Sequence, residues 1–302
     1  MSSSSLSVPT VRFSTLAGLL SKLRNYWSLV KDLQTGLLII TAVAGYATAC
    51  CTNLQAGSLV HLIASVFLSV GGSTILNMAF DRDIDARMRR TAARPIPSGA
   101  VKAWEAWLLG GILTAAGLGW SFALDGLFGG IIAAGVFLDV LVYTVWLKRR
   151  TPFSILLGGL SGGMPALAGR TLALGHMDSL GWLLAFSILL WIPTHIMSFT
   201  IKYQEDYNQA GVPTFASRYG LQTTRWIIAI STFLAVVSMA TLAAWLRVSL
   251  SSRIFFSATG IILMVLVAVG MIHPSKSTSF LLYKGASIYM LLSMIVLISG
   301  GF

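Results

Sequence analysis

Long apolar runs recur along the whole sequence and restrict what it can fold into. Each run is roughly 17 to 25 residues long, enough for an α-helix to cross the ~30 Å hydrocarbon layer of a bilayer. Only 10% of the 302 residues are charged, and a soluble domain of this length needs many more charges to cover its surface. We therefore predict a polytopic membrane protein. Its predicted spans lie near residues 35–54, 58–76, 104–122, 128–147, 152–170, 181–201, 226–246, 254–272 and 279–299.

The predicted fold class is all-α. The runs lack the period of two that the strands of a membrane barrel show, and helices also satisfy every backbone polar group in lipid. We expect a nine-helix transmembrane bundle over residues 34–302, with a central cavity open to the cytoplasmic side. Residues 1–33 would form a separate N-terminal segment, whose stretch LAGLLSKLRNYW is typical of an amphipathic helix in the membrane interface.

Basic residues are distributed unevenly between the two sides of this predicted bundle. Of the 21 Lys and Arg residues, all but Arg170, Arg247 and Arg253 precede the first span or lie in even-numbered connections. The positive-inside rule then places the N-terminus and those connections in the cytoplasm and the C-terminus outside. We expect a prokaryotic cell membrane, with the mitochondrial inner membrane less favoured. The net charge of +11 reflects topology and a phosphate-binding surface, and nucleic acid is not an expected partner.

The most polar stretch, NMAFDRDIDARMRRTAARPIPSG, follows the second span. Its Asn77, Asp81 and Asp85 are four residues apart, so on a helix they line one face with about 6 Å of rise per step. Carboxylates at the end of a membrane span are costly unless they meet a cation. Oxygen ligands with no cysteine nearby favour a hard metal ion, so we predict that these three residues bind Mg²⁺. Pro95 predicts that the helix ends at about Arg94.

A second acidic stretch, KYQEDYNQAGVP, follows the sixth span on the same predicted side of the membrane. We expect its Asp206 to face Asp81 across a cavity that opens to the cytoplasm, because Mg²⁺ takes six ligands and one helix face cannot supply them. Glu205 is the other acid of this stretch. The alternative is that these acids only neutralise basic loops through surface ion pairs. Ion pairs explain the charge balance but not the four-residue spacing of the first stretch.

Basic side chains close to the acidic stretches would suit a diphosphate group. Arg90 and Arg94 follow the first aspartates, and Lys148 and Arg149 end the fourth span. Each of them has the alternative role of a positive charge that only fixes the topology.

Two further features lie inside the predicted spans. Asp139 precedes Tyr143 by one turn in the fourth span, and an acid within a membrane span is either functional or paired with a nearby base. The fifth span has many small residues, which favour close helix packing: Gly158, Gly159, Gly162, Gly163 and Gly169.

Three stretches resemble the motifs of a known family. The stretch that begins at Asn77 is similar to the first aspartate-rich motif of the UbiA superfamily of intramembrane prenyltransferases. EDYNQAGVPTFASRYG resembles the second motif of the heme O synthases (protoheme IX farnesyltransferases) in that superfamily, and YTVWLKRRTPFSILLGGLSGGMPALAGR resembles their intervening segment. The resemblance runs from about residue 26 to the C-terminus. It departs at PTHI, where heme O synthases usually have Pro-Pro-His-Phe, although His195 keeps its register.

The resemblance implies a reaction and a set of site residues. The reaction is the Mg²⁺-dependent transfer of a farnesyl group from farnesyl diphosphate to the vinyl group of heme B, which gives heme O. The implied catalytic residues and metal ligands are Asn77, Asp81, Asp85, Glu205 and Asp206. The implied substrate-binding residues, with His195 beside the porphyrin, are Arg90, Arg94, Tyr143, Lys148, Arg149, His195, Tyr203 and Tyr207.

The expected partners are both substrates, membrane lipid and a downstream heme-modifying or oxidase-assembly protein. Two other functions stay open. A UbiA-type prenyltransferase could act on an aromatic quinone precursor or a glycerol-phosphate lipid, although many such relatives have a second D-x3-D where this chain has Tyr203 and Tyr207. A non-catalytic channel or transporter would show inverted repeats and interrupted spans, and this sequence offers only a loose pairing of two acidic stretches, four spans apart.

Overall fold

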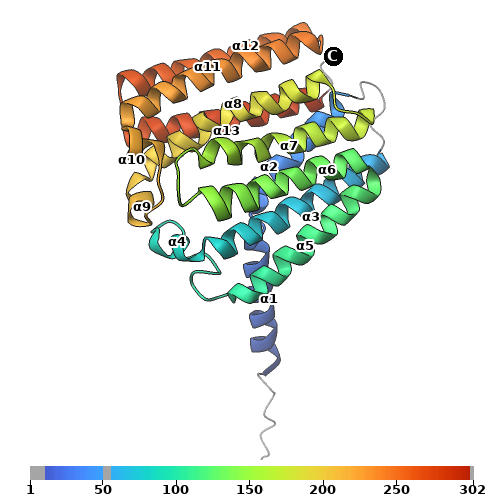
Figure 1. The fold of residues 1–302 in the computed structure, drawn as a ribbon, viewed down its shortest axis with the longest axis vertical. Coiled ribbons are helices and arrows are strands. Elements are labelled where there is room, and N and C mark those ends of the chain that lie inside the picture. Colours follow the sequence, from blue (N-terminus) through green and yellow to red (C-terminus); the bar gives the residue numbers. More distant parts are fainter. Residues whose placement is uncertain (1–10, 50–55, 300–302) are drawn as a thin grey trace, which may run out of the picture.

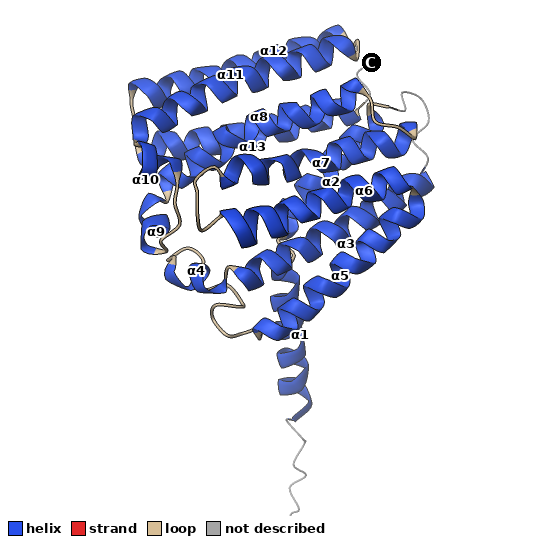
Figure 2. Ribbon diagram, viewed as in Figure 1, coloured by secondary structure: helices blue, strands red, loops and turns tan. Residues whose placement is uncertain are grey.

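The computed structural model describes residues 11–49 and 56–299, and these residues form helices joined by short connections (Figure 1). No strand occurs among them (Figure 2), so the all-α prediction is confirmed for this part of the chain. The helices are α1 (Val11–Leu29), α2 (Asp32–Ala47), α3 (Ala56–Phe80), α4 (Arg82–Arg87), α5 (Ala103–Leu124), α6 (Gly126–Val136), the π-helix η1 (Phe137–Leu147), α7 (Ser154–Leu174), α8 (Ser179–Lys202), α9 (Gln204–Gln209), α10 (Phe215–Tyr219), α11 (Leu221–Trp245), α12 (Leu250–Ile272) and α13 (Lys276–Ile298).

The long helices run side by side as one bundle (Figure 1). Each predicted span overlaps one of them, and the fourth is α6 continued by η1. Residues 50–54 of the first predicted span lie outside the described residues. Seven helical segments of the described chain are long and apolar enough to cross a membrane, and α1 with α2, bent by 48° at their junction, would be an eighth. α7 is less apolar because it carries its glycines and Arg170. The chain is a polytopic integral membrane protein, and the number of nine crossing helices stays a prediction.

The connections alternate between the two ends of the bundle. Lys148, which follows the fourth span, pairs with Asp81, which follows the second. Arg170 lies at the opposite end, where it pairs with Asp178 at 2.7 Å. In Figure 1 the short helices α4, α9 and α10 gather at one end, which we call the motif end, and the C-terminal end of the chain lies at the other. The motif end thus collects the basic connections, and its cytoplasmic location stays a prediction.

The N-terminal segment contains α1, which extends away from the bundle in Figure 1. Lys22 of α1 forms an ion pair with Glu105 at the start of α5, with 3.2 Å between Lys22 Nζ and Glu105 Oε1. Between α1 and α2, Lys31 has a positive φ of 48°, so the chain turns sharply there. Residues 1–10 lie outside the described residues, and the interfacial location of the segment stays a prediction.

Glycines allow α2 and α7 to pack with their backbones in contact. A Cβ at Gly45 of α2 would lie 2.0 Å from the Ala166 carbonyl oxygen of α7, and one at Gly169 of α7 would lie 1.9 Å from the Ala42 carbonyl oxygen of α2. A Cβ at Gly163 would lie 2.7 Å from the backbone of α8. Since backbone cannot move aside as a flexible side chain can, these positions require glycine. The close packing predicted for the fifth span is confirmed at Gly163 and Gly169.

We predict that Gly169→Ala destabilises the bundle by about 1–3 kcal/mol, because the added methyl group overlaps the Ala42 carbonyl. Gly36→Ala on α2 is the matched control, since a Cβ there meets nothing within 4 Å and alanine favours a helix. Thermal unfolding of both purified variants in the same detergent makes the comparison. Equal melting temperatures would contradict the close contact of α2 with α7.

Candidate active site

The first acidic stretch lies at the motif end, where α3 gives way to α4. Backbone hydrogen bonds run from the Asp81 N–H to the Asn77 carbonyl (2.9 Å) and from the Asp85 N–H to the Asp81 carbonyl (2.8 Å). The helical repeat therefore continues across the junction, and the predicted register of these three residues is confirmed. Asp81 and Asp85 are both buried, where an unpaired carboxylate is costly.

The helix of this stretch ends earlier than predicted, at Arg87 rather than at about Arg94. Met88 is extended, with φ −94° and ψ 124°, and the chain then turns back. The Thr91 hydroxyl donates to the Asp85 carbonyl at 2.9 Å, which fastens the turn. The turn brings Arg94 to Asp85, whereas a continuous helix would place these two residues about 13 Å apart along its axis.

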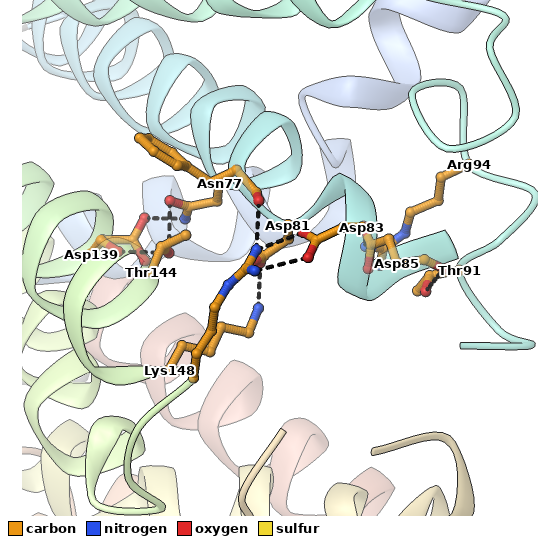
Figure 3. A network of polar contacts seen from close by, with 11 residues as sticks. Asn77, Asp81, Asp83, Asp85, Thr91, Arg94, Asp139, Thr144 and Lys148 are labelled. Carbon is orange, nitrogen blue, oxygen red and sulfur yellow. Dashed lines mark hydrogen bonds and ion pairs between the residues drawn. The ribbon is translucent and has the colours of Figure 1, made fainter. Parts of the chain in front are cut away.

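Both buried aspartates have a basic partner (Figure 3). Lys148 pairs with Asp81, and Arg94 Nη1 lies 2.8 Å from Asp85 Oδ2. Burial lowers the pKa of Lys148, but Tyr143 and Asp81 outweigh this effect and hold the pKa above its ordinary value. Lys148 is therefore charged at neutral pH. The basic residues that the sequence predicted near this stretch do lie there.

The third pair of the stretch joins Asp83 and Arg149 and is exposed. Both Nη atoms of Arg149 donate to the Asp83 carboxylate, at 2.6 and 2.8 Å, and Nη2 also donates to the Phe80 carbonyl at 2.9 Å. Hydrogen bonding by Arg149 holds the pKa of Asp83 below its usual range. The exposed fractions of the two side chains are 43% and 44%, so water screens this pair and it adds little stability. Here the surface ion pair that the sequence left as an alternative is present.

One carboxylate oxygen of the cluster has no partner among the described residues. Asp81 Oδ1 is buried and accepts no hydrogen bond, while Oδ2 of the same side chain is bound to Lys148. A buried oxygen without a donor is costly. A buried carboxylate oxygen of this kind is a ligand that a hard cation such as Mg²⁺ takes.

Asn77 points into the bundle, away from the ion pairs (Figure 3). Its Nδ2 donates to Asp139 Oδ2 at 2.7 Å, and the Thr144 hydroxyl donates to its Oδ1 at 3.0 Å. The Ser73 hydroxyl donates to the same Asp139 oxygen at 2.5 Å. Among the described residues Asp139 is therefore bound by amide and hydroxyl donors of α3, and not by a base. Asp139 therefore orients the side-chain amide of Asn77.

The π-helix η1 makes this arrangement possible. Its backbone bonds join residues five apart, as from the Lys148 N–H to the Tyr143 carbonyl at 2.8 Å. Residues four and five apart therefore lie on nearly the same face. Asp139, Thr144 and Lys148 consequently all reach α3 and the residues that follow it.

The second acidic stretch meets the first one. Asp206 is buried, and its Oδ2 accepts a hydrogen bond from the Arg90 backbone N–H at 3.4 Å. Tyr207 packs against the apolar cluster that joins Ile84 of α4 to Val212 beyond α9. Figure 1 shows α4 and α9 beside each other at the motif end. The two stretches thus meet at the motif end although they are over 100 residues apart in the sequence. The cavity between Asp81 and Asp206 stays a prediction.

The five predicted metal ligands do not converge into one ligand set. Glu205 is exposed, and its carboxylate lies 2.5 Å from Lys276 Nζ at the start of α13. Asn77 binds its neighbours in the bundle. Within residues 11–49 and 56–299, no three acidic, histidine or cysteine side chains gather as ligands for a metal ion. The metal-binding roles of Asn77, Asp81, Asp85, Glu205 and Asp206 stay a prediction.

The sequence matches the model of the UbiA prenyltransferase family over residues 38–295. The chain belongs to the UbiA prenyltransferase family. It is therefore a prenyltransferase, as the resemblance of its motifs implied, and not the channel or transporter that the sequence left open.

Curated relatives are similar over most of the chain. A protoheme IX farnesyltransferase of Archaeoglobus fulgidus is 35% identical over 94% of this chain and 100% of its own length. A protoheme IX farnesyltransferase of Korarchaeum cryptofilum is 40% identical over 72% of this chain and 73% of its own length. The resemblance to the heme O synthases is thus confirmed by full-length similarity.

Solved structures share the fold of this UbiA protein. Digeranylgeranylglyceryl phosphate synthase superposes with a TM-score of 0.77 over 93% of this chain and 98% of its own, at 21% identity. A UbiA homologue from Archaeoglobus fulgidus, solved with GPP and Mg²⁺, superposes with a TM-score of 0.67 over 91% and 99% of the two chains, at 14% identity. At these identities the likeness establishes the fold alone.

The other predicted substrate residues of this UbiA protein lie on two sides of the motif end. The Tyr143 ring packs against Gly158, where an added Cβ would lie 2.7 Å from the ring. The Lys148 ammonium lies 5.5 Å from the centroid of the same ring. His195 lies on α8, where its ring stacks on Trp191 at 4.6 Å, and Tyr203 follows directly after this helix. The structure therefore places Tyr143 beside Lys148 of the first site and His195 on α8.

Several polar residues of the site were not identified from the sequence. Ser73 and Thr144 bind Asp139 and Asn77 but carry no charge and recur throughout membrane helices, so no pattern marked them. Lys31 lies within electrostatic range of Arg94 and Lys148, although it precedes the first span. Its position follows from the turn between α1 and α2, which no sequence motif predicts.

We predict that Asp139→Ala lowers prenyl transfer about 10- to 100-fold, the usual loss when a residue that orients a ligand is removed. The substitution frees Asn77 Nδ2 and the Ser73 hydroxyl. Asp139→Asn keeps one acceptor and should lose less. Turnover and thermal unfolding are measured together, because a fall in turnover at unchanged melting temperature separates orientation from folding. Normal turnover of Asp139→Ala would show that the network is not needed.

Proposed function

We propose that this UbiA prenyltransferase transfers the farnesyl group of farnesyl diphosphate to a vinyl group of heme B and so produces heme O. The similarity of the whole chain to a protoheme IX farnesyltransferase supports this acceptor. The observation that carries the proposal is the hydrogen bond from the Arg90 N–H to Asp206. It joins the two acidic stretches at one end of the bundle, so their carboxylates and the basic residues beside them can serve one diphosphate.

In this proposal the acidic residues hold magnesium and the basic residues hold the diphosphate. Asn77, Asp81 and Asp85 would bind the metal from one stretch, and Glu205 and Asp206 from the other. Magnesium, when bound, offsets the negative charge of the diphosphate and makes it a better leaving group. The partnerless oxygen Asp81 Oδ1 supports this assignment, because it is a buried acceptor that lacks a cation or a donor.

Four basic residues would stabilise the departing diphosphate. Lys148, Arg94 and Arg149 now pair with carboxylates of the first stretch. Each can turn from a carboxylate to a phosphate oxygen, since both are anionic oxygen acceptors. Arg90 adjoins them through its contact with Asp206. Such positive charge favours the state in which the allylic C–O bond breaks and its electron pair leaves with the diphosphate.

The acceptor then completes the reaction. The π electrons of the heme vinyl group form a bond to the freed farnesyl carbon, and water adds to the resulting cation and loses a proton. Premature water would capture the farnesyl carbon first, so the site has to stay dry until the new bond forms. Tyr143, Tyr203 and Tyr207 are partly buried and would bound the site on its apolar side.

The location of the reaction follows from the charge pattern. The basic connections of the motif end would face the cytoplasm of a prokaryotic cell, and the C-terminus would lie outside. Both substrates would then reach the site from the cytoplasmic half of the membrane lipid. A heme-modifying or oxidase-assembly protein would accept the product.

The test is an incubation of the purified protein with heme B, farnesyl diphosphate and Mg²⁺, followed by chromatography and mass measurement of the porphyrin. Heme O is the expected product. An aromatic quinone precursor and a glycerol-phosphate lipid are supplied in parallel incubations. Prenylation of either of these, with heme B left unchanged, would overturn the proposed acceptor.

We predict that Asp81→Ala or Asp85→Ala reduces turnover to the level of the reaction without enzyme, because each removes a carboxylate proposed to bind the metal. Asp83→Asn is the matched control, since Asp83 is exposed and off the four-residue register. It should lose far less activity. A double variant of Asp81 and Asp85 with normal turnover would refute the metal assignment.

We predict that His195→Ala weakens binding of heme B while leaving binding of farnesyl diphosphate nearly intact. The reason is its place on α8, beside Trp191 and away from the ion pairs of the first stretch. Separate titrations with each substrate provide the comparison. Equal weakening for both substrates would make His195 a structural residue.

A further inference from the structure

Six aromatic side chains form a continuous surface along α8 and α13. Three of them, on α8, are four residues apart and share one face of the helix, a fourth follows directly after α8, and the two on α13 are three apart. We call this surface the ring wall: Trp191, His195 and Phe199 of α8, Tyr203 directly after α8, and Phe280 and Tyr283 of α13.

The rings of the wall contact one another across the two helices. The centroid of His195 lies 4.6 Å from Trp191 and 4.6 Å from Tyr283. Phe199 lies 4.7 Å from Tyr203 and 5.0 Å from Tyr283. These contacts join the rings from both helices into one continuous surface.

Hydrogen bonds hold this surface in place. Trp191 Nε1 donates to the Ala286 carbonyl of α13 at 2.8 Å. The Ser287 hydroxyl and His195 Nδ1 form a hydrogen bond of 3.1 Å. The wall is therefore fixed before any ligand arrives, which lowers the entropy cost of binding.

The wall runs deep and is accessible. All six side chains are partly buried, so none is fully enclosed in the core. From Trp191 to Phe199 the wall rises roughly 12 Å along α8, at 1.5 Å per residue, and Tyr203 continues it beyond the helix end. Interfacial aromatic belts gather at the headgroup level of a membrane, and a row of this depth extends well beyond that level. The ring planes are tilted against one another by 13 to 86°, so the wall is an aromatic lining that offers ring faces and edges to an aromatic ligand.

Two lysines lie over the wall near the motif end. The ammonium groups of Lys202 and Lys284 lie 5.4 and 4.8 Å from the centroid of Phe280. In the described part of the chain neither lysine forms an ion pair with a carboxylate, whereas Lys148 and Lys276 each do. Two neighbouring cations without an acid are suited to a ligand that carries two carboxylates.

The wall also adjoins the diphosphate residues. The Arg90 guanidinium lies 4.9 Å from the centroid of Phe199 and 5.5 Å from that of Tyr203. The backbone of the same residue binds Asp206. A ligand on the wall would therefore lie next to the prenyl donor.

We propose that the ring wall binds the flat face of the acceptor macrocycle, and that Lys202 and Lys284 bind its two carboxylate side chains. This inference rests on the proposed function and names the acceptor subsite of the same reaction. The donor does not fit the wall equally well, because a prenyl chain has no flat ring and carries its charge as diphosphate. Heme B has both features, a planar macrocycle and two propionates at one edge.

The experiment compares ferric protoporphyrin IX with its dimethyl ester, in which both carboxylates are neutral. Each porphyrin is titrated by absorbance into the full-length protein in nanodiscs. We expect the double variant Lys202→Gln, Lys284→Gln to bind the diacid about ten-fold more weakly and the diester as the unaltered protein does. Phe280→Leu should weaken binding of both porphyrins, because it removes a stacking ring but no charge.

Arg225→Gln is the control for charge alone. Arg225 lines a separate pocket with Ser198 and Ile201, and its substitution should leave both porphyrin affinities unchanged. Magnesium-dependent binding of farnesyl diphosphate is measured for every variant to confirm an intact fold. Equal loss for diacid and diester in the lysine variant, or no loss for either, overturns the proposal.

The outcomes also separate this proposal from the proposed function. If the unaltered protein makes heme O and the variants bind both porphyrins normally, the ring wall is not the acceptor subsite and the proposed function stands. If the unaltered protein binds farnesyl diphosphate but neither porphyrin, the acceptor is not a heme and both proposals fail.

Discussion

A carboxylate buried at the end of a membrane helix needs positive charge beside it, and the motif end is arranged around this need. Asp81 forms an ion pair with Lys148 at the end of η1, and Asp85 forms one with Arg94 in the loop that follows α4. Removing one partner of a buried ion pair costs about 3–5 kcal/mol, because it strands a charge. The two pairs therefore fix the position of η1 against α3 and the path of the loop after α4. The contact with Asp206 depends on that path, since Arg90 lies on the same loop.

In the proposed function, ion pairing and substrate binding would use the same charges, so the ion pairs of the acidic stretch do not argue against a diphosphate site there. Without substrate, Lys148 compensates Asp81, and its raised pKa keeps it charged. A diphosphate with its magnesium brings both an anion and a cation. Lys148 could then bind phosphate while the metal compensates Asp81, and no buried charge would be left unpaired at any stage.

The sequence predicted those features that depend on local spacing or on topology. The register of Asn77, Asp81 and Asp85 followed from the four-residue repeat, and the meeting of both acidic stretches followed from counting spans. The end of the helix at Arg87 did not, because it depends on the ion pair of Arg94 with Asp85, which is a tertiary contact. The π-helix could not be predicted either, because its wider turn does not change the pattern of apolar residues in the sequence. Its consequence, the binding of Asp139 to α3, could only be seen in the fold.

The excess of basic residues at the motif end has a physical explanation if both substrates are anions. A diphosphate and a dicarboxylic macrocycle repel each other, and the reaction requires them to lie side by side. One cluster of cations could hold one of them but would leave the other unbalanced. The chain instead pairs Arg94 and Lys148 with carboxylates of the first acidic stretch. Lys202 and Lys284, which form no ion pair within the described residues, lie over the Phe280 ring of α13. Arg90 stands between them, with its backbone on Asp206 and its guanidinium over Phe199. A net charge of +11 in a chain that is only 10% charged is then what two adjacent anion sites demand, beyond what the orientation of the helices requires.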